Sequence, residues 1–248
     1  MTPNPQYPNP GAAAPKITPG IAIAAFVLGL IGMCVPCLGL IGVILGIVAL
    51  VKIGNDAALG GRVWAILGIV LPLVAIPIQA AIAIPNFIKF QARSKQAECK
   101  ANLKAAYFAE SQYYQQHDAF SPNIGEVGFQ PERGNRYAYF LYEVGAVEDR
   151  STAQVESDPR AVGVNVDTFK HRDLRPLAMS DLPELAGDAK PGVHGQCPKC
   201  SFTAVCIGNV DQDAVLDVWS VSSQSRTGPD GQAIPPGVPY NDVSDVNN

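Results

Sequence analysis

Charged residues are scarce in the first third of this 248-residue chain, although they make up 16% of the whole. Between residues 21 and 84 the only ionisable side chains are Lys52, Asp56, Arg62 and two cysteines. A soluble domain carries about a quarter charged residues throughout, so this segment is not part of one. We therefore expect a membrane-embedded segment in the first third, with the lipid bilayer as its partner.

The sequence also lacks the signatures of nucleic-acid binding and of catalysis. The net charge is −4, and no face dense in Lys and Arg interleaves with aromatic residues, which excludes nucleic-acid binding. His117, His171 and His194 have no nucleophile, Gly-rich phosphate loop or HExxH motif beside them. We expect a protein that is not an enzyme.

Two apolar runs predict membrane spans, over about residues 21–51 and 63–84. Each is long enough to cross the ~30 Å hydrocarbon layer. Pro36 removes a helical hydrogen bond within the first run, so this run is either one kinked span, which we favour, or a tight hairpin of two short helices. The run is too long for a cleaved signal peptide and lacks a basic start. Cys34 and Cys37 are expected to be small packing residues there.

The Gly-rich pattern of about residues 20–75 ends in the sequence GRVWAILG at residues 61–68. This pattern resembles a small two-span bacterial membrane domain of unknown function. The resemblance implies membrane insertion and no particular chemistry.

A second motif follows the second apolar run. Residues 81–98 read AIAIPNFIKFQARSKQAE. This stretch resembles the N-terminal helix of type IV pilins and pseudopilins, in which an apolar membrane half ends in an Ala-Ile-Pro-Asn-Phe type motif. Pro85, Asn86 and Phe87 are accordingly the expected membrane-exit motif. The likeness continues through the aromatic residues near Tyr107 and Tyr114 to residues 131–140.

Helical periodicity supports a long helix over about residues 64–118. Residues at steps of three and four form one stripe, which is apolar except for its glutamate: Cys99, Leu103, Ala106, Tyr107, Glu110 and Tyr114. Such a stripe has to be buried, and a sheet from the downstream chain is the available partner. Leu103, Tyr107 and Tyr114 are therefore predicted packing residues of the helix.

The predicted fold class is α+β, with a membrane-spanning helical anchor followed by a long pilin-like helix packed on a small antiparallel sheet. Strands are expected over residues 137–144, 202–210 and 215–221. The expected divisions are a disordered Pro-rich tail at 1–20, a transmembrane region at 21–84, a pilin-like α/β domain at 85–221, and a flexible tail at 222–248. Residues 146–196 are irregular and carry no clear element.

Four cysteines lie outside the apolar runs: Cys99, Cys197, Cys200 and Cys206. If the domain is exported, at least one disulfide is the favoured interpretation, and any pairing among the four is open. A zinc site that adds His194 to the last three cysteines has tolerable spacing but lacks a second Cys-x-x-Cys pair. Covalent haem attachment is excluded, since Ser201 stands where Cys-x-x-Cys-His needs its histidine.

Asp211, Asp213 and Asp217 are separated by two and four positions, so their side chains would point to the same side of an extended chain. Oxygen ligands at this spacing suit calcium, although the glycine and distal glutamate of a helix-loop-helix calcium loop are missing. Turn-forming aspartates at a hairpin tip are the alternative. Calcium is thus a possible cofactor, and a calcium-binding or thiol-active envelope sensor is the alternative function.

Two positions depart from the pilin pattern. Counted back from Pro85, the first residue of a mature pilin aligns with Trp64, but Val63 replaces the glycine of the leader-cleavage site, and Gly68 replaces the glutamate near the start of the mature helix. The resemblance thus implies a structural or interaction protein on a permanent membrane anchor. Its expected partners are pilin or secretion-system subunits or a second copy, in pilus or type II secretion machinery or in surface adhesion.

The basic residues alone favour a cytoplasmic globular domain, because five of them follow the second apolar run: Lys89, Arg93, Lys95, Lys100 and Lys104. Pilins carry a similar basic stretch on the outer side, and the resemblance therefore places the globular domain outside the cytoplasmic membrane. The expected location is the bacterial inner membrane, as a multi-pass protein.

Overall fold

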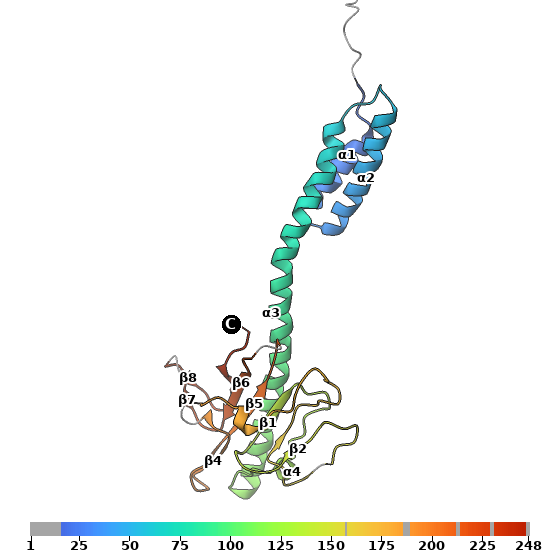
Figure 1. Ribbon diagram of the computed structural model, residues 1–248. Coiled ribbons are helices and arrows are strands. Elements are labelled where there is room, and N and C mark those ends of the chain that lie inside the picture. The colour runs from blue at the N-terminus through green and yellow to red at the C-terminus, as the bar shows by residue number, and fades with distance from the viewer. Residues whose placement is uncertain (1–15, 157, 186–188, 212–213, 229–230, 247–248) are drawn as a thin grey trace, which may run out of the picture. The chain divides into compact units, whose positions relative to one another are not determined.

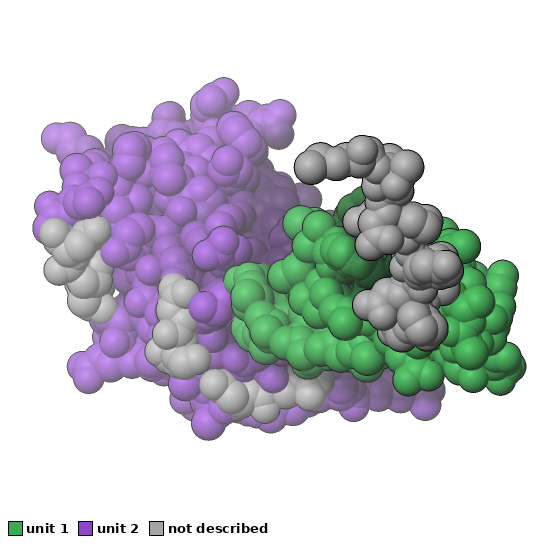
Figure 2. All heavy atoms as spheres, turned by 90° about the horizontal axis from the view of Figure 1, so that it is seen from above, with its two compact units in different colours: residues 1–87 green, residues 88–248 purple. Residues whose placement is uncertain are grey.

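The computed structural model describes residues 16–156, 158–185, 189–211, 214–228 and 231–246 (Figure 1). The chain divides into two compact units, Met1–Phe87 and Ile88–Asn248, which we call the membrane unit and the globular unit (Figure 2). Helix α3 (Arg62–His117) is 56 residues long and contributes to both. Residues 1–15 and 247–248 of the two predicted tails lie outside the described residues.

The membrane unit contains α1 (Gly20–Ile31), α2 (Pro36–Asn55) and the first part of α3, which lie side by side (Figure 1). The favoured single kinked helix over residues 21–51 is wrong, because the chain turns at residues 32–35 and returns as a hairpin. Pro36 starts α2 rather than kinking a continuous helix, since the first helical position needs no N–H donor.

Helix lengths in this unit differ. The 20 residues of α2 rise about 30 Å, whereas the 12 residues of α1 rise only about 18 Å. Two described helices, α2 and α3, are long and apolar enough to cross a bilayer. Three prolines, Pro72, Pro77 and Pro85, lie inside α3 without ending it.

The globular unit is built on a seven-stranded sheet whose order is β2-β3-β1-β5-β6-β9, with β4 also paired to β5. The strands are β1 (Tyr137–Phe140), β2 (Val147–Glu148), β3 (Gly163–Val164), β4 (Gly192–His194), β5 (Ser201–Gly208), β6 (Asp217–Ser222) and β9 (Tyr240–Val243). The predicted α+β class with a long helix on a sheet is confirmed. The sheet is mixed rather than purely antiparallel, because β2 and β3 run parallel.

Both faces of the sheet are buried at its centre, since alternate residues of β1, β5 and β6 enter different cores. On β1, Tyr137 and Tyr139 join the core that contains Cys99 and Leu103 of α3. Ala138 and Phe140 enter a second core on the opposite face. A strand buried on both sides reads as continuously apolar, which explains the aromatic run of β1.

The second core is closed by the segment that the sequence leaves without clear elements. Val166, Leu177, Leu185 and Ala189 pack there against β1, β5 and β6. Within this segment the 3-10 helix η1 (Met179–Asp181) is short, and the single-turn helix α4 (Ile124–Val127) precedes β1. Irregular backbone with spaced apolar residues thus forms a layer of the fold.

The segment 222–248, which was predicted to be a flexible tail, contains strands in the structure. Strand β9 pairs with β6 at the edge of the main sheet, and β7 (Arg226–Thr227) pairs with β8 (Ala233–Ile234). Asp245 is buried, and its Oδ2 accepts a hydrogen bond from the backbone N–H of Val210 at 3.0 Å. Polar, Pro- and Gly-rich sequence is here compatible with order, because the edge of β6 supplies backbone partners.

Candidate functional site

The junction of α3 with the sheet holds a carboxylate surrounded by donors. Asp217, the first residue of β6, is 0% exposed. Its Oδ1 accepts hydrogen bonds from Gln96 Nε2 (2.9 Å), Asn241 Nδ2 (3.1 Å) and the Asp245 backbone N–H (3.3 Å), and its Oδ2 accepts from Tyr137 OH (2.8 Å) and Trp219 Nε1 (2.6 Å). These donors come from α3, β1, β6 and the C-terminal segment. Asp217 therefore ties the helix, the sheet and the chain end together.

This arrangement bears on the predicted calcium ligands. Asp217 faces inward with both oxygens hydrogen-bonded, whereas Asp211 is exposed in the preceding loop and Asp213 lies outside the described residues. Among the described residues, no group of three or more His, Cys, Asp or Glu side chains could hold a metal ion. Of the three predicted ligands, Asp217 is thus engaged by donors of the sheet, the helix and the C-terminal segment.

A second polar contact fixes α3 on β1. Glu98 Oε1 accepts the backbone N–H of Arg136 at 2.9 Å and the hydroxyl of Tyr139 at 3.1 Å. Asn102 Nδ2 donates to the same hydroxyl at 2.7 Å. Burial raises the pKa of Glu98, and these hydrogen bonds oppose the rise. The contact fixes the rotation of α3 on the sheet.

Of the three predicted packing residues of α3, Leu103 and Tyr107 pack against the sheet. Leu103 is fully buried. The Tyr107 ring stacks on Phe202 of β5 at 6.2 Å between centroids, and the Tyr114 ring stacks on Phe120 at 4.6 Å. The membrane-exit residues are different, since Phe87 is 59% exposed and Pro85 and Asn86 are also exposed.

The four predicted disulfide cysteines form two bonds. Cys99 of α3 is joined to Cys206 of β5 across 107 residues, and both are fully buried. Cys197 is joined to Cys200 across three residues, in the turn between β4 and β5. Bonded thiols cannot serve as zinc ligands, so the zinc alternative with His194 is wrong. Cys34 and Cys37 in the membrane unit are free.

Glu110 is the polar member of the buried stripe on α3. It is 1% exposed, and its Oε2 accepts the backbone N–H of Ser121 at 3.2 Å. Ser121 Oγ in turn donates to Glu126 at 2.5 Å. Burial raises the pKa of Glu110 to about 8, with a further contribution from Glu126. At neutral pH this carboxyl is mostly protonated and joins the end of α3 to the following loop.

Buried ion pairs hold the irregular segment in place. Arg150 is 2% exposed and pairs with Glu148 at 2.9 Å. Arg133 pairs with Asp167 at 2.6 Å, and this contact holds the pKa of Asp167 down at about 2. Their partners lie up to 34 residues apart, so no local sequence motif could reveal these pairs.

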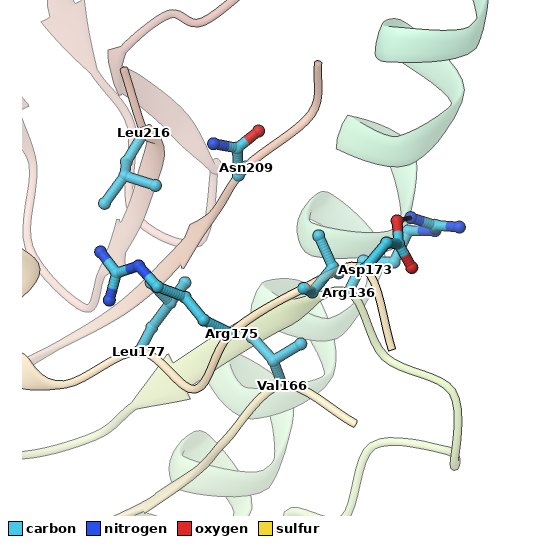
Figure 3. Close-up of a pocket in the computed structure, with 8 residues that line it drawn as sticks. Arg136, Val166, Asp173, Arg175, Leu177, Asn209 and Leu216 are labelled. Carbon is cyan, nitrogen blue, oxygen red and sulfur yellow. Dashed lines mark ion pairs between the residues drawn. The ribbon is translucent and has the colours of Figure 1, made fainter. Parts of the chain in front are cut away.

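A pocket of about 300 Å³ opens on the second-core side of the sheet (Figure 3). It is lined by Arg136, Val166, Asp173, Leu174, Arg175, Leu177, Asn209 and Leu216. Arg136 pairs with Asp173 at 4.0 Å, and Arg175 with Asp181 at 2.8 Å. Both arginines of the lining are thus paired with carboxylates.

The three histidines have structural contacts. His171 Nε2 lies 2.8 Å from the carbonyl oxygen of Gly134, and His194 Nε2 lies 3.0 Å from that of Lys190. The His117 ring lies 4.2 Å from the Tyr113 ring. Each histidine thus fixes a turn or a helix end.

Comparison with known proteins gives the same fold assignment. A family model described as "Type IV pilin PilA" matches residues 90–217. The "Type IV major pilin protein PilA" of Myxococcus xanthus (strain DK1622) is 36% identical over 203 residues, which cover 75% of this chain and 92% of that relative. The chain belongs to the type IV pilin family. Its Cys99–Cys206 disulfide and long apolar helix are features of this pilin's own structure.

The two departures of this pilin from the family pattern lie at the start of α3. Val63 is 66% exposed, at the position aligned with the cleavage-site glycine. At Gly68, aligned with the family's glutamate, a Cβ atom would lie 2.6 Å from the carbonyl carbon of Ala25 in α1. No larger side chain fits there while α1 is in place. The N-terminal hairpin therefore occupies the surroundings of that position.

Proposed function

We propose that this pilin is a non-catalytic structural subunit that remains in the inner membrane and joins pilus-type machinery through its globular unit. The observation that carries the proposal is the uncovered face of α3 in that unit. Phe90 and Phe108 are each 68% exposed, and the intervening residues Ala97, Ala101 and Ala105 are exposed as well. An exposed apolar helix face of this size supports association with another helix, in a pilin subunit or a second copy.

Retention in the membrane is supported by the α1–α2 hairpin. Large apolar side chains of α2 such as Leu40, Ile44 and Ile47 are 51–60% exposed. Moving each such side chain from lipid to water costs roughly 1.5–3 kcal/mol. We therefore expect the hairpin to keep the chain in the bilayer as a multi-pass protein.

Two disulfides support the placement of the globular unit outside the cytoplasm. Cys99–Cys206 and Cys197–Cys200 both lie in that unit. Such bonds persist in oxidising compartments and are rare in the cytosol. The apolar α3 then crosses the inner membrane, and its later part extends to the outer side.

Covalent capture in cells tests the machinery role. A photo-crosslinking residue in place of Phe108 is expected to trap pilin or pilus-assembly subunits, and the same residue at the exposed Lys199, on the β4–β5 turn, serves as the matched control. Capture of secretion-system pseudopilins instead would move the assignment to type II secretion. Binding of cells to surfaces that depends on the protein, without either partner, would assign adhesion. Equal and unspecific capture at both positions would refute the proposal.

A further inference from the structure

The membrane half of α3 has one face of small residues, and the chain covers this face itself. Ala65, Gly68, Pro72 and Ala75 are buried at steps of three and four residues. The large residues of the other face remain exposed, as in Leu73 at 56%. Helices in lipid associate through small residues, because these allow the backbones to approach closely. The α1–α2 hairpin therefore packs on the face of α3 that is best suited to bind another helix.

Three glycines, one from each helix, meet at the centre of this packing. A Cβ atom at Gly29 of α1 would lie 2.9 Å from the Gly68 carbonyl oxygen of α3. One at Gly42 of α2 would lie 2.8 Å from the Gly29 backbone nitrogen. Side chains essentially never approach backbone this closely, so any larger residue at these positions forces the helices apart. Backbone contact of this kind leaves no room for a fourth helix between them.

A polar clamp holds the turn of the hairpin. Gln79 carries the only amide or charged side chain between residues 63 and 85. Its Nε2 donates to the carbonyl oxygens of Met33 and, at 3.5 Å, Gly32. Carbonyls at a helix end have no partner within the helix, and unpaired carbonyls are costly in lipid. Gln79 therefore stabilises the docked hairpin specifically at its tip.

Aromatic packing closes the opposite end of the bundle. The Phe26 ring of α1 meets the Trp64 ring of α3 edge-on at 4.8 Å. Next to it, Ala22, Ala49, Ile53 and Ala65 form a small core with residues from all three helices. The hairpin is thus fixed to α3 near both of its ends and at its centre.

We propose that the α1–α2 hairpin is a built-in partner that excludes a second copy of this chain from the small-residue face of α3, so that self-association through that face requires the hairpin to detach. A short loop joins the hairpin to α3. The effective concentration of the hairpin at the small-residue face is therefore higher than the concentration that a separate chain reaches there. This inference rests on the proposed retention in the membrane, but it concerns contacts within the bilayer rather than the outer machinery.

Two substitutions separate the hairpin from α3 and leave the small-residue face unchanged. Gly46→Leu on α2 introduces a side chain toward α3, since a Cβ atom at Gly46 would already lie 2.9 Å from the Ala65 carbonyl oxygen. Gln79→Leu removes the clamp without adding bulk between the helices. Lipid-facing residues give matched controls, namely Ile44→Leu on α2 and Ile78→Leu on α3, which are 60% and 56% exposed. All variants use the full chain with Phe108→Ala, so that association through the globular unit does not contribute.

Mass by light scattering in detergent micelles is the first measurement, and Trp64 fluorescence in a Trp219→Phe background reports hairpin docking. We expect monomers for the parent and both controls. Gly46→Leu and Gln79→Leu should show a shifted Trp64 emission and a doubled protein mass, with at least tenfold tighter self-association. Detached variants that stay monomeric would overturn the proposal, as would a parent chain that dimerises as strongly as the variants.

A covalent link between α1 and α3 decides the case in which Gly46→Leu does not fold. Cysteines replacing Phe26 and Trp64, whose rings meet at 4.8 Å, in a background with Cys34→Ser and Cys37→Ser, are joined by a short bifunctional thiol reagent that reduction cleaves. The link is expected to return Gln79→Leu to a monomer, and cleavage of the link to restore the dimer. A linked Gln79→Leu chain that still dimerises would contradict the proposal. These outcomes are independent of the capture of pilus subunits at Phe108.

Discussion

Replacing Asp217 by asparagine removes one acceptor oxygen from a buried cluster of five donors. If the new NH₂ group takes the Oδ2 position, the Tyr137 hydroxyl can rotate, but the indole N–H of Trp219 cannot. If it takes the Oδ1 position, the Asp245 backbone N–H loses its acceptor. A buried donor without a partner costs about 1–3 kcal/mol, and the remaining bonds lose their charge assistance. We expect Asp217→Asn to lower the free energy of unfolding by about 3 kcal/mol.

Trp219 fluorescence in a Trp64→Phe background follows this unfolding directly, because the indole is part of the cluster. The assay is chemical denaturation of the full chain in detergent, with and without calcium. Asp211→Asn is the matched control, since Asp211 is exposed in the neighbouring loop. We expect the control to unfold like the parent and calcium to change none of the three midpoints. An Asp217→Asn chain as stable as the parent, or a calcium-dependent midpoint lost in both variants, would refute the structural role.

Two further predictions concern buried groups of the globular unit. The pKa of Glu110 is raised from 4.5 to about 8 in the folded chain, so parent stability falls as pH rises between these values; Glu110→Gln should therefore gain stability relative to the parent from pH 5 to pH 8 in denaturation curves. Removing the Cys99–Cys206 bond, which closes 107 residues, with paired alanines should cost about 5 kcal/mol, against about 2 kcal/mol for Cys197–Cys200. In thiol titrations the exposed Cys197 bond should also be reduced first.

Three results would contradict these predictions. A stability difference between Glu110→Gln and the parent that stays constant with pH would mean that the carboxyl is ionised in the fold. Equal losses for the two disulfide variants would show that loop closure does not govern their contributions. Reduction of Cys99–Cys206 before Cys197–Cys200 in the native chain would contradict its burial.

Periodicity identified the part of the fold that depends on one helix. The stripe of Leu103, Tyr107 and Tyr114 follows from helical spacing alone; Leu103 and Tyr107 pack in the core against the sheet, and Tyr114 stacks on Phe120. The glutamate in that stripe, Glu110, was the exception that periodicity could not explain. Its burial becomes understandable only with the Ser121 backbone in place, and that contact depends on how the chain turns after α3.

Composition gave the wrong prediction for segments that are ordered by contacts with residues far away in the sequence. Residues 166–189 and 222–246 are rich in polar residues, Pro and Gly, so hydrophobic pattern predicts no layer or strand there. Val166 and Leu177 nevertheless close a core, and β9 is ordered by the free edge of β6. Asp217 illustrates the same limit, since its donors come from residues up to 121 positions away. Local spacing does not reveal these donors, because they come from other elements of the fold.

The sequence leaves open whether residues 21–51 form one kinked helix or a hairpin. Pro36 allows either a kink or a new helix, and the sequence near it does not choose. Distant residues decide, because Pro72 meets Gly39 and Gln79 bonds the turn carbonyls. Both partners lie in α3, so the choice depends on three-helix packing rather than on residues 21–51 alone.

Protease access to the globular unit tests the central claim, a pilin domain held outside the inner membrane by its own helical anchor, most directly. Spheroplasts and inverted membrane vesicles are treated with protease, and the fragments are identified by mass. We expect residues 88–248 to be cleaved in spheroplasts and protected in inverted vesicles, with the hairpin still attached to α3 in the membrane fragment. Cleavage in inverted vesicles with protection in spheroplasts would contradict the account.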